Sequence, residues 1–147
     1  MKQLQTWILT LNAAFLVGGS LGGLFLLDIP GMLASGPARA ILGPAPYLAI
    51  GFLEAHCLAF VIAMLLWHGE PKARWHFTAL STELILGTCN ILCWQLFVVT
   101  GTLVMGYLTT SLHWIFAALQ LVTLGAAARR TEEGRDAMSR ASAVIAD

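Results

Sequence analysis

Four ionisable side chains lie inside long apolar stretches of this sequence of 147 residues. Glu54 and His56 share one stretch, Glu83 lies in the next, and His113 lies in the last. A charged side chain near the centre of a bilayer costs about 2.5–3.5 kcal/mol on insertion scales, so these groups are expected to face the protein interior. A carboxylic acid beside an imidazole is an acid/base couple. We therefore predict that these four residues are catalytic.

Amide and indole side chains recur on the same helix faces as these ionisable groups. At 100° per residue, Glu83 lies in a narrow arc that also holds His76 and Asn90. His113 and Gln120 are seven residues apart, a spacing that keeps both on one seam of a left-handed bundle. The residues predicted to bind a substrate are Asn12, Asn90, Trp94, Trp114 and Gln120. The simpler interpretation is interhelical hydrogen bonding by the amides and packing by the indoles.

The simplest alternative for the acids is a Glu–His pair that only holds helices together. Burial disfavours a charged carboxyl group, so at least one of the two acids is expected to hold a proton unless a histidinium pairs with it. Glu54 and His56 point about 160° apart on one helix and cannot share a narrow face. Either both flank a broad inward arc, or one of them meets a neighbouring subunit in a homo-oligomer.

The composition indicates that membrane-spanning helices position these residues. The chain is 58% hydrophobic and 11% charged, whereas soluble domains have about 25% charged residues. Four apolar stretches, at about 7–27, 47–67, 77–99 and 102–128, are each near the length of roughly 20 residues that crosses a bilayer. We predict an all-α integral membrane protein: an antiparallel bundle of four transmembrane helices in residues 1–128, followed by a polar cytoplasmic tail at 129–147.

The connections between these stretches differ in length. Residues 28–46 contain four prolines and are predicted to form a loop with a short interfacial helix near Ala38–Leu42. Thr100, Gly101 and Thr102 are the only break predicted between the last two spans. In the first span, the pairs Gly18/Gly22 and Gly19/Gly23 have the G-x-x-x-G spacing that permits close approach of another helix.

Basic residues are distributed unequally between the two ends of the predicted bundle. With four spans, one side holds seven of them, and the other side holds only Arg39. Because basic residues mark the cytoplasmic side, both termini are predicted to be cytoplasmic, in a bacterial inner membrane. The seven residues are Lys2, Lys72, Arg74, Arg129, Arg130, Arg135 and Arg140.

The sequence carries no motif for a metal ion or cofactor and no cluster of basic and aromatic residues for nucleic acid. The partners predicted are therefore the lipid bilayer and a lipophilic small molecule. One cofactor alternative stays open, because His56 and His113 lie at similar depth on different helices and could ligate a haem.

Between about Trp7 and Gly125 the chain resembles small DoxX-like and EXPERA-type membrane proteins. The resemblance rests on the topology and on Glu54, Glu83, Asn90 and Trp94 within the spans. An EXPERA domain usually has one more helix than the four counted here. The resemblance implies a cofactor-free isomerase or cyclase that acts on an isoprenoid, sterol-like or polyketide-like substrate.

Three other functions remain open from the sequence. Glu54 and Glu83 could alternate between protonation states in a proton-coupled carrier or channel. His56 and His113 could belong to a haem- or quinone-binding membrane subunit. The chain could also be an accessory subunit whose buried polar groups meet a larger partner.

Overall fold

The computed structural model describes residues 2–146, and every regular element in that range is a helix. Side chains are described throughout this range except at positions 131, 134, 136, 137 and 140–146. Met1, at the start of the predicted transmembrane domain, and Asp147, at the end of the predicted tail, lie outside the described residues.

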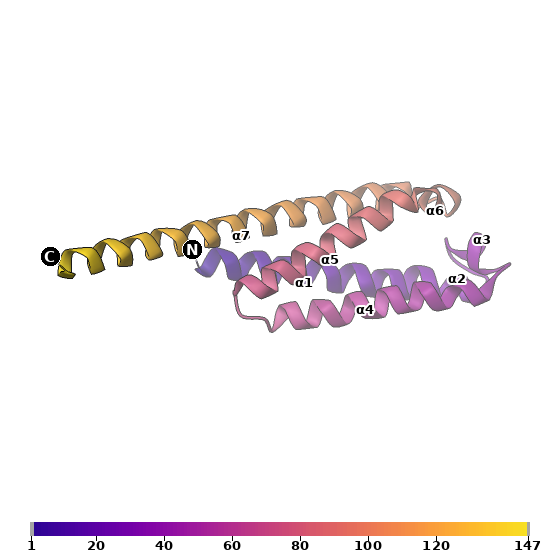
Figure 1. The fold of residues 1–147 in the computed structure, drawn as a ribbon. Coiled ribbons are helices and arrows are strands. Elements are labelled where there is room, and N and C mark those ends of the chain that lie inside the picture. The colour runs from indigo at the N-terminus through magenta and orange to yellow at the C-terminus, as the bar shows by residue number, and fades with distance from the viewer. Residues whose placement is uncertain (1, 147) are drawn as a thin grey trace.

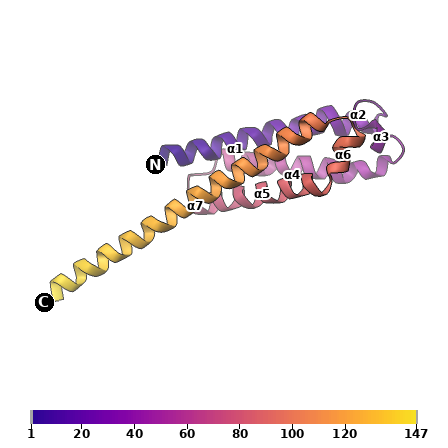
Figure 2. The same cartoon turned by 90° about the horizontal axis from the view of Figure 1, so that it is seen from above.

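Two helical hairpins make up the fold. In the first, α1 runs alongside α4; in the second, α5 runs alongside α7 (Figure 1). The four long helices lie side by side in both views, and α7 extends beyond the other three (Figure 2). The elements are α1 (Lys2–Gly22), η1 (Gly23–Asp28), α2 (Ile29–Met32), α3 (Arg39–Leu42), η2 (Pro46–Leu48), α4 (Ala49–Trp67), α5 (Ala73–Leu92), α6 (Trp94–Val99) and α7 (Leu103–Ala146).

Three helical segments of the described chain are long and apolar enough to cross a membrane, which makes this a membrane protein. They are Lys2–Met32, Pro46–Trp67 and Leu103–Arg130, with mean hydropathies of 1.7, 2.1 and 1.5. The segment predicted as the third span is not among them. It is also divided, because α5 ends at Leu92 and α6 begins at Trp94. The expectation of one unbroken helix over 77–99 is therefore wrong.

The first span is longer than predicted. Residues 28–32, expected to belong to a loop, instead continue the helix through the π-helical turn η1 and the short α2. Pro30 lies in the first turn of α2, where a missing N–H is tolerated, so it does not end the helix. The short helix predicted near Ala38–Leu42 is confirmed by α3.

A tight turn joins α6 to α7, as the sequence predicts. Gly101 has φ 68°, a left-handed conformation that favours glycine. Its N–H donates to Val98 O at 3.2 Å, and the N–H of Thr102 donates to Phe97 O at 2.9 Å. These two bonds form a Schellman motif, which satisfies the carbonyl groups left free at the end of α6.

The main apolar core lies where the first hairpin meets the beginning of α5. It contains Leu9, Ala13 and Leu16 from α1, Ala63 and Leu66 from α4, and Ala79 from α5. Many large apolar side chains elsewhere are exposed, among them Val104 at 83%. Outward apolar side chains are stable in lipid, so the inward face of a membrane bundle is free to carry polar groups.

Candidate functional site

A buried polar network joins the two hairpins. Asn12 on α1 donates a hydrogen bond from Nδ2 to Oε1 of Glu83 on α5. His113 Nδ1 lies 2.5 Å from the other carboxylate oxygen, Oε2. Gln120 Nε2 donates to Asn12 Oδ1 at 2.9 Å, and His76 Nδ1 lies 2.6 Å from Gln120 Oε1. None of the five residues is more than 8% exposed.

Helical periodicity explains why these residues meet. His76 and Glu83 are seven residues apart on α5, and His113 and Gln120 are seven apart on α7, so each pair spans two turns of one face. Gly87, one turn beyond Glu83, lets α7 approach closely. A Cβ at position 87 would lie 3.2 Å from His113 Cβ, closer than most Cβ contacts.

The hydrogen bonds of the polar network all run toward Glu83. A side-chain amide donates from one end and accepts at the other, so the orientation of Gln120 sets that of Asn12. The N–H of His76 donates to the side-chain oxygen of Gln120. The amide nitrogen of Gln120 then donates to the side-chain oxygen of Asn12, and the amide nitrogen of Asn12 donates to Glu83. Glu83 then accepts a bond at each oxygen, which suits an ionised carboxylate.

His113 is the member of the polar network that reaches the surface. Its Nδ1 is held by Glu83, and its ring edge packs on Phe15, with 5.0 Å between ring centroids. Nε2 makes no hydrogen bond within the described part of the chain and is not enclosed, since 10% of the side chain is exposed. The neutral imidazole therefore offers a free lone pair at its outer nitrogen.

A second carboxylate–histidine pair lies between η1 and α4. His56 Nδ1 is 2.6 Å from Asp28 Oδ2; the carboxylate is fully buried, and 27% of the histidine side chain is exposed. Asp28 Oδ1 is buried and has no hydrogen-bond partner. A Cβ at position 23 would lie 2.0 Å from His56 Nε2, so only glycine leaves room for this ring.

The structure separates the other predicted site residues from the polar network. Glu54 lies on the exposed surface of α4, so its predicted convergence with Glu83 and His113 is wrong within one chain. Asn90 is half-buried and donates to Thr109 Oγ1 at 3.3 Å. Trp94 packs against the rings of α6 and α7, and Trp114 is 42% exposed.

Two members of these clusters escaped the sequence analysis. His76 shares the predicted arc with Glu83, but its place near the start of the span suggested a solvated histidine; the seven-residue spacing was the signal for its inward position. Asp28 was assigned to the loop because a proline follows two residues later. No signal in the sequence connected it with His56.

Comparisons with protein-family models, curated proteins and solved structures give no match for this chain. The resemblance to DoxX-like and EXPERA-type proteins therefore stays a prediction. What the protein does has to be inferred from the polar network and the two carboxylate–histidine pairs.

The two surface-reaching histidines are placed apart from each other. His113 packs on Phe15, whereas His56 packs on Gly23, which lies eight residues further along the first span, at the start of η1. At 1.5 Å per residue, the two contact positions are about 12 Å apart along the helix axis. This separation lends no support to a haem held between His56 and His113. Among the described residues, no three His, Cys, Asp or Glu side chains are placed to hold a metal ion.

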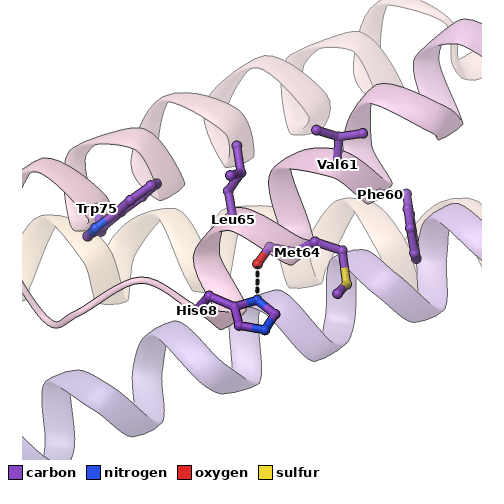
Figure 3. A pocket seen from close by; sticks show the side chains of 6 residues that line it. All are labelled: Phe60, Val61, Met64, Leu65, His68 and Trp75. Carbon is purple, nitrogen blue, oxygen red and sulfur yellow. Dashed lines mark hydrogen bonds between the residues drawn. The ribbon is translucent and has the colours of Figure 1, made fainter.

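One hollow of the surface lies away from the polar network. A groove of about 380 Å³ runs along α4 and reaches the first turn of α5 (Figure 3). Its lining residues are Phe60, Val61, Met64, Leu65, His68 and Trp75. His113 does not line this groove.

Proposed function

We propose that this protein is an integral membrane enzyme that transfers a proton within a lipophilic molecule and uses no cofactor for that step. One observation carries the proposal: the inner nitrogen of His113 is bound to the buried Glu83, and the outer nitrogen is free at the surface. A carboxylate in this position fixes the tautomer of the imidazole and stabilises the imidazolium that forms when the ring accepts a proton.

Isomerisation or cyclisation by proton transfer is the reaction class that this arrangement supports. His113 Nε2 would remove a proton from a carbon next to a carbonyl group or double bond. The electron pair of that C–H bond would form a new double bond, and the imidazolium would return the proton to another carbon. The reaction conserves electrons and needs no second reactant. Glu83 would remain ionised and would act as a positioning residue for the ring.

The surroundings of His113 favour an apolar substrate such as an isoprenoid or polyketide-like molecule. Phe15 and Phe116 stack with 5.4 Å between their ring centroids, beside the imidazole. Trp114 follows His113 in the chain and is 42% exposed. These aromatic side chains offer large apolar surfaces against which a lipophilic substrate can pack. The substrate would enter laterally from the bilayer.

Deuterium incorporation tests this proposal without knowledge of the substrate. Purified protein in vesicles made from host lipids is incubated in D2O, and the extracted lipids are examined by mass spectrometry. The wild-type protein should introduce deuterium into one lipid class. His113→Gln and Glu83→Gln should lower the rate about 10²–10⁴-fold, because positioned acid/base groups contribute this much. Gln95→Ala, at an exposed position on α6, is the control and should retain the wild-type rate.

Thermal unfolding of each variant in detergent shows whether the protein has folded. Equal deuterium incorporation by wild-type and His113→Gln proteins would remove His113 from the reaction. If neither protein introduces deuterium into any host lipid, the proposed class of substrate is overturned.

The proposed topology places α5 across the membrane as a fourth span, with both termini in the cytoplasm of a bacterium and the bundle in its inner membrane. The low hydropathy of α5 is compatible with this because His76 and Glu83 face α1 and α7 rather than lipid. The unequal distribution of basic residues supports the orientation. Reporter fusions that distinguish cytoplasm from periplasm, placed after residues 36 and 70, should give opposite signals. Equal signals would exclude the topology.

A proton-coupled carrier is the second candidate, favoured by the interrupted helices. The π-helical turn η1 interrupts the first span, and Cys93 separates α5 from α6. Transporters commonly place binding sites where membrane helices are interrupted. In proteoliposomes, uptake of a host metabolite driven by a proton gradient and abolished by Asp28→Asn would favour this candidate over the enzyme.

The exposed carboxyl group of Glu54 is best accommodated by a neighbouring subunit. This residue lies within the apolar α4 and is not covered by its own chain. An ionisable group in this position requires a partner other than lipid. A homo-oligomer or a larger membrane complex would supply one, and a crosslink from a cysteine at position 54 would show which.

A further inference from the structure

We propose that the groove between α4 and the start of α5 binds an anionic phospholipid, with an acyl chain along α4 and the phosphate at Arg74. This groove is separate from His113, so the proposal does not depend on the proposed enzymatic function. The shape of the groove, its depth in the membrane and the charges at its rim support it.

The shape of the groove fits one flexible apolar chain. Its volume of about 380 Å³ lies within the roughly 300–1,000 Å³ typical of small-molecule sites. Figure 3 shows four apolar side chains from successive turns of α4, Phe60, Val61, Met64 and Leu65, with Trp75 beside α5. His68 closes one end and is the only lining residue with an ionisable side chain.

The groove crosses the boundary between the apolar and polar parts of the membrane. Residues 60–65 belong to the candidate span Pro46–Trp67, whereas His68 lies one residue beyond the end of that span. Trp75 lies in the first turn of α5, on the far side of the connecting turn. A ligand in this groove therefore has one end among lipid tails and the other at the level of the head groups, which is the arrangement of a phospholipid.

The charge at the polar end is positive because one basic side chain has no carboxylate partner. Lys72 and Glu70 form an ion pair with 2.5 Å between Nζ and Oε2, which neutralises both. The guanidinium carbon of Arg74 lies 5.6 Å from the centre of the Trp75 ring, and no carboxylate pairs with Arg74 within the described part of the chain. Trp75 thus forms a wall of the groove and also supports the guanidinium beside it.

The unpaired guanidinium selects the head group. Arginine binds phosphate through two parallel N–H bonds, and its charge attracts a lipid with net negative charge more than a zwitterionic one. Each basic residue near a membrane surface favours anionic lipid by about fivefold. His68 donates from Nδ1 to Met64 O at 2.9 Å, so Nε2 of the neutral ring is an acceptor and the phosphate is left to Arg74.

Fluorescence quenching tests the proposal with two defined probes: phosphatidylglycerol and phosphatidylcholine, each with brominated acyl chains. Full-length protein is placed in vesicles that contain a small fraction of one probe. The contribution of Trp75 is the difference in quenching between wild-type and Trp75→Phe proteins. Brominated phosphatidylglycerol should quench Trp75 at about fivefold lower mole fraction than brominated phosphatidylcholine, and salt should reduce this difference.

Arg74→Gln should abolish the preference while both lipids still quench. Arg39→Gln, on α3 at the opposite end of the bundle, is the matched control and should keep the wild-type preference (Figure 1). Equal quenching by both lipids in the wild-type protein would overturn the choice of an anionic lipid. Absence of quenching by either lipid would mean that something else, such as a second copy of the chain, covers the groove, and the proposal would fail.

Discussion

The two carboxylate–histidine pairs of this protein have similar distances but different surroundings. Glu83 and Asp28 are both buried, and each lies within 2.6 Å of a histidine Nδ1. Glu83 also accepts a hydrogen bond from Asn12, so both of its oxygens have partners. Asp28 has one partner, and its Oδ1 is buried without another.

This difference separates a fully satisfied carboxylate from a partly satisfied one. A buried acceptor without a donor costs about 1–3 kcal/mol. Among the described residues this cost falls on the Asp28 carboxylate itself, whereas in the polar network it falls on His76 Nε2, away from Glu83. A carboxylate with complete hydrogen bonding favours one protonation state and one orientation of its neighbours. The hydrogen bonds of Glu83 therefore hold the His113 ring in one orientation, whereas the Asp28–His56 pair depends on a single bond.

The largest expected effect comes from removal of each carboxylate in turn. Glu83→Leu leaves Asn12 and His113 without an acceptor and should destabilise the protein by about 3–5 kcal/mol, the range for breaking a buried pair. Asp28→Leu removes one hydrogen bond but also removes one unsatisfied oxygen. The expected loss of stability is therefore smaller, about 1–3 kcal/mol. Reversible unfolding in mixed detergent micelles measures both. An equal loss in the two variants would contradict the comparison.

A substitution at Gly23 can disrupt the Asp28–His56 pair without changing either residue of the pair. A methyl group at position 23 would overlap the His56 ring, so Gly23→Ala should displace the ring and cost about 1–3 kcal/mol. Gly19→Ala is the matched control, because a Cβ there meets nothing within 4 Å. It should be neutral or stabilising by up to about 1 kcal/mol. If Gly23→Ala is as harmless as Gly19→Ala, the packing of His56 on Gly23 is incorrect.

His76→Phe tests whether the polar network keeps Glu83 ionised. Without the N–H of His76, the amides of Gln120 and Asn12 can turn over and present oxygen to Glu83, which then has to carry a proton. The expected loss of stability is about 1 kcal/mol. Infrared spectroscopy at neutral pH should show a protonated carboxyl band that disappears when Glu83→Gln is added. His68→Phe, outside the network, should show no such band; absence of the band in His76→Phe would refute this coupling.

The smallest effect is expected at the exposed Glu70–Lys72 pair, which serves as a reference for the buried ones. The hydrogen bond from Lys72, and then its charge, lower the pKa of Glu70 below its ordinary value of 4.5. A lowered pKa in the folded state contributes stability above pH 4.5 that is lost as the pH falls through the lowered value. Lys72→Met should raise the pKa of Glu70 in an NMR titration and lower stability near neutral pH only slightly, because water screens exposed pairs. A marked loss of stability at pH 7 would contradict this.

Helical spacing was enough to predict which faces of α5 and α7 point inward. Glu83, His113 and Gln120 are buried, as their seven-residue pattern indicates. The four glycines of the first span show the limit of such patterns. Only Gly23 meets another helix, whereas a Cβ at Gly18, Gly19 or Gly22 would meet nothing within 4 Å. The G-x-x-x-G spacing permits close helix approach but does not specify that a partner is present.

By itself, the sequence determined that the chain forms long helices that are apolar enough to cross a membrane. Composition and hydrophobic length settle that much, because the free energy of transfer from water to lipid depends on residue type alone. Only the tertiary structure decided which partner each polar group finds. Glu83 bonds to Asn12 and His113, and Asp28 bonds to His56, whereas Glu54 is exposed and bonds to no side chain that the structure describes. A hydrogen bond depends on the relative position of two helices, and the periodicity of one helix carries no information about the rotation and height of its neighbour.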